Sequence, residues 1–190
     1  MDQQKPEDKN PLIRTCSREL SEAHPATVSS PAYIVLDIPS PMAEKIQDYR
    51  RKFDAERAAL PVEITVTGSS GVGTISPGQN WNEVFELVDK VAASISPFES
   101  EFYKVERFEN TNIFYLTFRN PSKYENVHKK LANSGVKFDP SPFPYKPHCT
   151  IKLVSVPDDN ELLELFFMEI PRSRFVIDTL SIYSLDRKST

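Results

Sequence analysis

The stretch PHCTIK, residues 147–152, alternates polar and apolar side chains, and it governs the interpretation of the whole chain. Side chains of a β-strand point alternately to its two faces. One predicted face carries His148, Thr150 and Lys152, and the other carries Cys149 and Ile151. We therefore predict a strand over residues 148–154, with its apolar face in the core and its polar face available to a ligand.

A second stretch, VEITVT at residues 62–67, repeats this alternation. Its polar face carries Glu63, Thr65 and Thr67, while the side chains of Ile64 and Val66 are expected in the core. The quartet 63–66 matches the quartet 148–151 position by position: a polar residue, an apolar residue, a threonine and an apolar residue. If a pseudo-twofold axis relates the two stretches, their polar faces meet across one groove.

The order of elements around these two stretches also repeats. Hydrophobic periodicity, prolines and glycines predict strands at 32–38, 62–67 and 98–108 and helices at 42–60 and 81–95, with Asn80 as a cap. The second half repeats the series at 113–118, 122–133, 148–154, 158–168 and 175–185. We predict an α+β fold with two pseudo-symmetric β-α-β-α-β lobes, approximately residues 32–108 and 112–185, whose antiparallel-type sheets face a central cleft.

Composition limits the classes of function. The chain has 190 residues, 39% of them hydrophobic and 26% charged, with a net charge of -4. These values predict one bilobal domain over residues 31–186 and give no basic surface for duplex DNA. Residues 1–30 are polar and proline-containing, which predicts a disordered leader. The two cysteines are far apart in sequence, which favours a reducing compartment, and no apolar run is long enough to span a membrane. We therefore expect a cytoplasmic location without membrane contact. We also expect a monomer.

The paired quartets resemble the signature of the 2H phosphoesterase superfamily, which includes 2′-5′ RNA ligases and cyclic phosphodiesterases. That signature is two copies of His-apolar-Ser/Thr-apolar on the central strands of two similar lobes. Residues 147–151 match it well. Residues 60–66 keep the leading Leu-Pro, the threonine and the apolar pattern, but Glu63 stands where the family has histidine. The resemblance covers residues 31–186 in element order.

The resemblance implies chemistry at a nucleotide or RNA end, on 2′,3′-cyclic phosphate or 2′-5′ phosphodiester bonds. A base and an acid are needed on opposite sides of the phosphorus, and no metal or other cofactor is expected. By this analogy Glu63 is the base, His148 the acid, and Thr65 and Thr150 hold the phosphate oxygens. A free glutamate is an anion at neutral pH and would repel phosphate, unless burial raises its pKa or a nearby cation such as Lys146 or Lys152 offsets its charge.

Two alternatives follow from the same residues. A site with Glu63 in place of histidine could bind a nucleotide or RNA end without turnover, or the resemblance could be fortuitous and the chain an interaction module. Possible further substrate contacts are Tyr115, Tyr145, Phe143 and Lys152. Tyr33 and Tyr115 are expected at equivalent places in the two halves. His24 and His128 are predicted on the surface. The turn GSSGVG at 68–73 lacks the Lys-Ser/Thr ending of a phosphate-binding P-loop, so we predict a flexible connection there.

Overall fold

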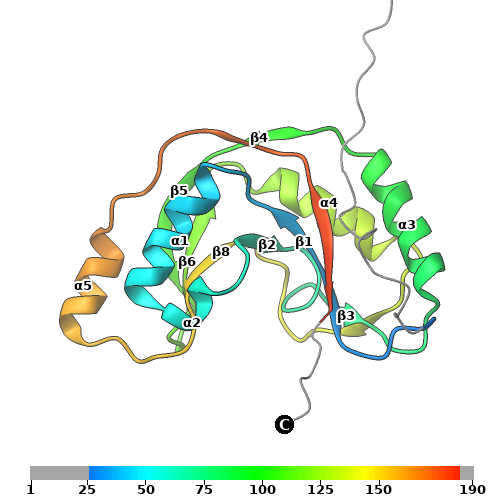
Figure 1. The fold of residues 1–190 in the computed structure, drawn as a ribbon, viewed down its shortest axis with the longest axis horizontal. Helices are drawn as coiled ribbons and strands as arrows, with labels where there is room; N and C mark the ends of the chain where they lie inside the picture. The colour runs from blue at the N-terminus through cyan, green and yellow to red at the C-terminus, as the bar shows by residue number, and fades with distance from the viewer. Residues whose placement is uncertain (1–25, 185–190) are drawn as a thin grey trace, which may run out of the picture.

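The computed structural model describes residues 26–184 and has an α+β fold of two lobes (Figure 1). The first half of the chain forms β1 (Ala32–Asp37), α1 (Met42–Phe53), α2 (Ala55–Ala58), β2 (Glu63–Thr65), β3 (Val72–Ile75), α3 (Trp81–Ala93), β4 (Phe98–Ser100) and β5 (Phe102–Arg107). The second half forms β6 (Phe114–Phe118), α4 (Ser122–Ala132), β7 (Phe138–Pro140), β8 (Cys149–Lys152), α5 (Asp159–Phe167), β9 (Phe175–Ile177) and β10 (Leu180–Ser184). The predicted fold class is confirmed.

Each lobe takes outer strands from the opposite half of the chain: β7 and β10 join the sheet of β1, and β5 joins the sheet of β6. One sheet has the order β10-β1-β3-β7 with β2 also paired to β1, and a second sheet has the order β5-β6-β8. All of these pairs are antiparallel. The strands β4 and β9 pair with each other where the two halves cross. The predicted lobes 32–108 and 112–185 therefore describe sequence repeats, whereas the lobes in space mix both halves.

The first helix of each half also lies on the lobe of the other half (Figure 1). Helix α1 packs beside β8, and α4 lies beside α3. Residues Met42, Ile46, Arg50 and Phe53 form the buried face of α1. Asp54 then ends α1 and caps α2, because its carboxylate accepts a hydrogen bond from the backbone N–H of Arg57 at 2.9 Å. The helix predicted over 42–60 is thus two helices, and the short second one sets the position of Arg57.

Most of the predicted leader, including His24, lies outside the described residues. Residues 26–30 are described, and they pack on the body of the protein: Val28 is buried, and its backbone N–H donates to the carbonyl oxygen of Gln79 at 2.8 Å. Asn80 caps α3, as predicted, by accepting from the backbone N–H of Asn82.

The turn at 68–73 packs closely at Gly71, and its last two residues begin β3, while its flexibility stays a prediction. Gly71 has a φ of +74°, and a Cβ at this position would lie 2.3 Å from His128. Its backbone N–H also donates to the carbonyl oxygen of Phe143 at 2.7 Å. The close approach of α4 to this turn depends on the missing side chain of Gly71.

Substitution of Gly71 by alanine is expected to destabilise the protein by at least about 2 kcal/mol, since strain at positive φ adds to the collision with His128. Gly78→Ala is the matched control, because Gly78 has a φ of +84° but nothing within 4 Å of the added Cβ. The control should cost about 1 kcal/mol from backbone strain alone. Urea unfolding of both variants measures the difference, and equal losses would contradict the packing argument.

Candidate active site between the lobes

The strands that carry the two motifs, β2 and β8, lie next to each other between the lobes (Figure 1). Arg50 joins them from the buried face of α1. Its Nε donates to the carbonyl oxygen of Thr150 at 3.0 Å, and its Nη1 donates to the carbonyl oxygen of Pro61 at 2.8 Å. Its Nη2 lies 3.7 Å from Oε2 of Glu63. One fully buried guanidinium therefore links both motifs.

Glu63 is held in a cluster of charged side chains. Only 7% of its side chain is exposed, and its Oε1 accepts from Nη2 of Arg57 at 2.7 Å. With Arg50, this places two positive charges beside one carboxylate. Asp37 lies opposite Glu63 in the register of β1 and β2, and burial raises the pKa of Asp37. The anion that sequence analysis identified as a barrier to phosphate is thus neutralised by arginines.

His148 immediately precedes β8, and its ring has a defined orientation. Nδ1 lies 2.7 Å from the carbonyl oxygen of Lys146, which can only accept, so Nδ1 carries the proton. In the neutral ring Nε2 then carries the lone pair. The ring contacts the aromatic rings of Phe108 and Tyr115 at centroid distances of 5.1 and 5.2 Å. Burial lowers the pKa of His148, and the positive charge of Arg57 acts in the same direction.

A second polar cluster supports this histidine. Nζ of Lys146 donates to Oε2 of Glu106 at 2.7 Å and to the hydroxyl of Tyr115 at 2.6 Å. The Tyr115 hydroxyl donates to the same carboxylate, and Tyr115 lies opposite Thr150 in the register of β6 and β8. Hydrogen bonds from Lys104 and Lys146 lower the pKa of Glu106 to about 2. Tyr115 thus lies at the site, but 1% exposure leaves its ring unavailable for stacking on a base.

Lys152 lies away from this polar face, so its predicted place beside His148 and Thr150 is wrong. Its ammonium is 1% exposed, pairs with Glu161 at 2.9 Å and donates to the carbonyl oxygen of Phe53 at 2.9 Å. The register between β6 and β8 shifts between Thr150 and Lys152, which breaks the regular alternation of faces. Lys146 pairs with Glu106 and Lys152 with Glu161, so the charge of Glu63 is offset by arginines instead of by either lysine.

The loop residues proposed as base contacts divide into one packed and one exposed residue. The ring of Tyr145 stacks on His128 at a centroid distance of 4.1 Å. Phe143 is 65% exposed. His128 is half-buried and its Nδ1 lies 2.8 Å from the carbonyl oxygen of Val66, so its prediction as a surface residue is wrong. His128 and Tyr145 together pack the turn after β2 in place.

The first lobe contributes polar side chains that sequence analysis missed. Asp37 accepts hydrogen bonds from Ser181 and Tyr183 of β10, and the ring of Tyr183 contacts that of Tyr33. The alternating sequence of β10 (LSIYS) could have predicted a polar face, but its pairing with β1, a strand of the other half of the chain, could not be predicted from local periodicity.

The register also shows that Thr65 lies opposite Val35, whereas Thr150 lies opposite Tyr115. Tyr33 and Tyr115 are therefore not equivalent.

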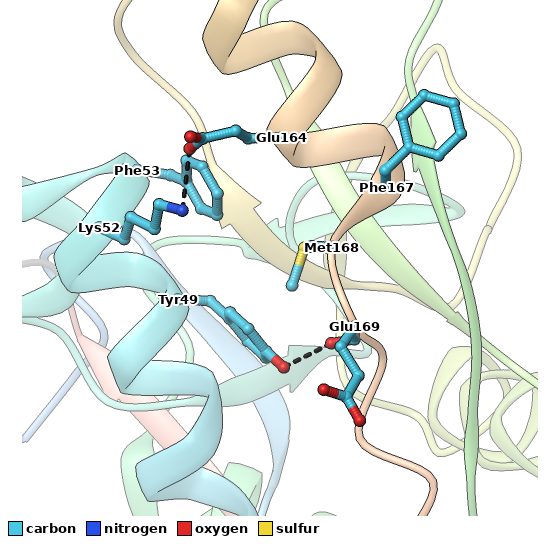
Figure 2. Close-up of a pocket in the computed structure, with 7 residues that line it drawn as sticks. All are labelled: Tyr49, Lys52, Phe53, Glu164, Phe167, Met168 and Glu169. Carbon is cyan, nitrogen blue, oxygen red and sulfur yellow. Dashed lines mark hydrogen bonds and ion pairs between the residues drawn. The ribbon is translucent and has the colours of Figure 1, made fainter.

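A separate pocket lies between α1 and α5 (Figure 2). It is lined by Tyr49, Lys52, Phe53, Glu164, Phe167, Met168 and Glu169, and it has a volume of about 400 Å³. Lys52 and Glu164 form an ion pair across it, and the Tyr49 hydroxyl donates to the carbonyl oxygen of Glu169. This pocket contains no motif residue, so we place the candidate site at β2 and β8 instead.

The paired polar faces on two similar lobes are the arrangement of a 2H phosphoesterase. The family model of the 2′-5′ RNA ligase superfamily matches residues 38–189, and the chain belongs to this superfamily. The alternative of a fortuitous resemblance is thereby wrong. A comparison of the sequence with curated proteins finds no match.

Solved structures share the fold at low sequence identity. Apo LigT from E. coli is 19% identical, with a TM-score of 0.53 over 82% of this chain and 88% of LigT. LigT complexed with NADP⁺ is 14% identical, with a TM-score of 0.52 over 83% of this chain and 88% of LigT. TT0787 of Thermus thermophilus is 12% identical, with a TM-score of 0.54 over 80% of this chain and 86% of TT0787.

Within residues 26–184, no three histidine, cysteine, aspartate or glutamate side chains form a group that could hold a metal ion. No helix in the same part of the chain has the length and apolar character needed to cross a membrane.

Proposed function

We propose that the chain is a phosphoesterase that acts on 2′,3′-cyclic phosphate or 2′-5′ phosphodiester bonds of RNA ends or nucleotides. The proposed chemistry uses acid-base side chains without a metal ion. Membership of the superfamily supports the class of reaction. The complex of E. coli LigT with NADP⁺ supports a nucleotide ligand for this fold. The free, buried thiol of Cys149 agrees with a reducing compartment, so a cytoplasmic location is part of the proposal.

The geometry of His148 is the observation that carries this proposal. Its Nδ1–H is held by the carbonyl oxygen of Lys146, and its lowered pKa favours the neutral ring at pH 7. Nε2 can then accept a proton from the attacking oxygen, and the leaving oxygen would take its proton from water, since the Glu63 carboxylate is paired with Arg57. This geometry favours His148 as the base, whereas sequence analysis assigned it as the acid. Thr65 and Thr150, on the two adjacent strands, would donate hydrogen bonds to the non-bridging oxygens.

Binding without turnover is the second candidate function, and the ion pairs of Glu63 favour it. In the superfamily pattern, the first motif supplies a second proton-transfer group. Here Glu63 is already paired with Arg57 at 2.7 Å and approaches Arg50 at 3.7 Å. Transfer of a proton through Glu63 would have to break the Arg57 contact. A site with one free proton-transfer group and two threonines could hold a nucleotide or RNA end as a ligand.

The deciding experiment measures hydrolysis of a 2′,3′-cyclic nucleotide and of a 2′-5′-linked dinucleotide with a chelator present, between pH 5 and 9. We expect turnover whose rate falls as the pH decreases through the lowered pKa of His148, below about 6.5, because the base becomes protonated. Above neutral pH the rate should be nearly constant.

Three other outcomes have distinct meanings. A rate that falls as the pH rises through this range would assign His148 as the acid. Tight binding of the nucleotide without turnover would establish the second candidate. A protein that neither cleaves nor binds these ligands would overturn both functions.

A further inference from the structure

Arg57 occupies an unusual position in the site. It comes from α2, directly before β2, and the capping carboxylate of Asp54 anchors its backbone N–H at 2.9 Å. Its guanidinium contacts Glu63, and 16% of its side chain is exposed. Its charge adds to the effect of burial in lowering the pKa of His148. Arg57 thus contacts the first motif and still reaches solvent.

The other cations near the motifs are committed elsewhere. Arg50 donates to three backbone carbonyl oxygens, and its Nη2, which lacks a hydrogen-bond partner among residues 26–184, is fully buried. Lys146 donates to Glu106 and Tyr115, and Lys152 is buried against Glu161. Arg57 makes one side-chain ion pair, and its Nε is buried without a hydrogen-bond partner among residues 26–184. Unlike Arg50, Arg57 therefore combines an unpaired donor with exposed surface.

Guanidinium chemistry suits a phosphate at this place. Arginine presents five N–H donors in a planar fork that matches the geometry of phosphate oxygens. The contact with Glu63 uses one edge of this fork, at Nη2. An anionic ligand near His148 would find the repulsion from Glu63 offset by Arg57 and by Arg50.

We propose that Arg57 binds the phosphate of the ligand and that Glu63 is the positioning residue that holds its guanidinium. The proposal rests on the function proposed above, since it assigns a new phosphate contact to the same site. It gives the glutamate of the first motif a role in binding: the carboxylate orients a cation toward the place where the superfamily pattern has a histidine.

The test measures affinity for inorganic phosphate and for a nucleoside 3′-monophosphate by titration calorimetry at pH 7.5. Arg57→Gln is expected to weaken binding roughly 10- to 100-fold, the usual range for loss of a charge-assisted hydrogen bond. Arg57→Lys, which keeps the charge but not the fork, should fall between this variant and wild type. The matched control is Arg51→Gln, since Arg51 is exposed on α1 and pairs with Asp48; it should bind like wild type.

The role of Glu63 is tested by rescue with a conservative variant. Glu63→Gln keeps an oxygen that accepts from Arg57, so it should bind phosphate within about 3-fold of wild type, whereas Glu63→Ala should lose roughly 10-fold or more. Equal affinities of Glu63→Gln and Glu63→Ala would overturn the positioning role. Unchanged affinity in folded Arg57→Gln would overturn the phosphate contact and leave the proposed function standing. Wild type that binds neither ligand would overturn both.

Discussion

Replacement of His148 by alanine is expected to reduce turnover of a 2′,3′-cyclic nucleotide by about 100-fold or more, the usual scale for a general base. The imidazole is the one motif side chain with a free proton-accepting nitrogen, because its Nδ1–H is bound to the carbonyl oxygen of Lys146. Steady-state kinetics at pH 7.5 measures the loss, which should appear mainly in kcat.

Binding provides the control for this experiment. At pH 7.5 the lowered pKa leaves His148 neutral, so it contributes no charge to phosphate affinity. His148→Ala should therefore bind a nucleoside 3′-monophosphate within about 10-fold of wild type, since only a neutral hydrogen bond is lost. Loss of turnover with retained binding identifies a proton-transfer role. Unchanged turnover would remove His148 from the chemistry.

Replacement of Glu63 by alanine is expected to lower the free energy of unfolding by about 3–5 kcal/mol, as for other broken buried ion pairs. The variant leaves Arg50, which has no exposed surface, without its nearby carboxylate, and Arg57 without its contact. Glu63→Gln should cost less, about 1–3 kcal/mol, because its amide oxygen still accepts a hydrogen bond. Urea unfolding monitored by tryptophan fluorescence gives these values.

An exposed ion pair serves as the matched control. Lys52 and Glu164 pair at 2.8 Å with more than half of each side chain exposed. Glu164→Ala should change the free energy of unfolding by at most about 1 kcal/mol. If Glu63→Ala were as stable as Glu164→Ala, the buried arginines would have to be compensated by groups other than Glu63.

The sequence was sufficient to predict the fold class and both motif strands. The alternation in VEITVT and PHCTIK depends only on which side chains enter the core, and local periodicity reports this directly. The repeat of strand and helix signals predicted two similar halves. The structure places β2 and β8 side by side, as a pseudo-twofold relation required. The roles of Glu63, Thr65, His148 and Thr150 stay proposals.

The positions of Arg50 and Arg57 in the site, and the shift in strand register near Lys152, could not be predicted from sequence periodicity. Arg50 lies four residues after Ile46 on the buried face of α1, but arginine is usually exposed, so this spacing alone does not predict a core position. Arg57 follows a break at Asp54 within a stretch that looked like one helix. Lys152 is displaced by a shift in register, which no alternation rule can locate. These features depend on tertiary contacts between distant segments.

The exchange of β5 and β10 has a consequence for how the protein gains and loses its structure. If the chain were cut between β5 and β6, each fragment would carry a strand whose partner belongs to the other fragment. The edges of β1 and β6 would then be left with open hydrogen-bonding groups. The two halves are consequently obligate complements, like the subunits of an interlocked dimer, and the protein should unfold as one cooperative unit.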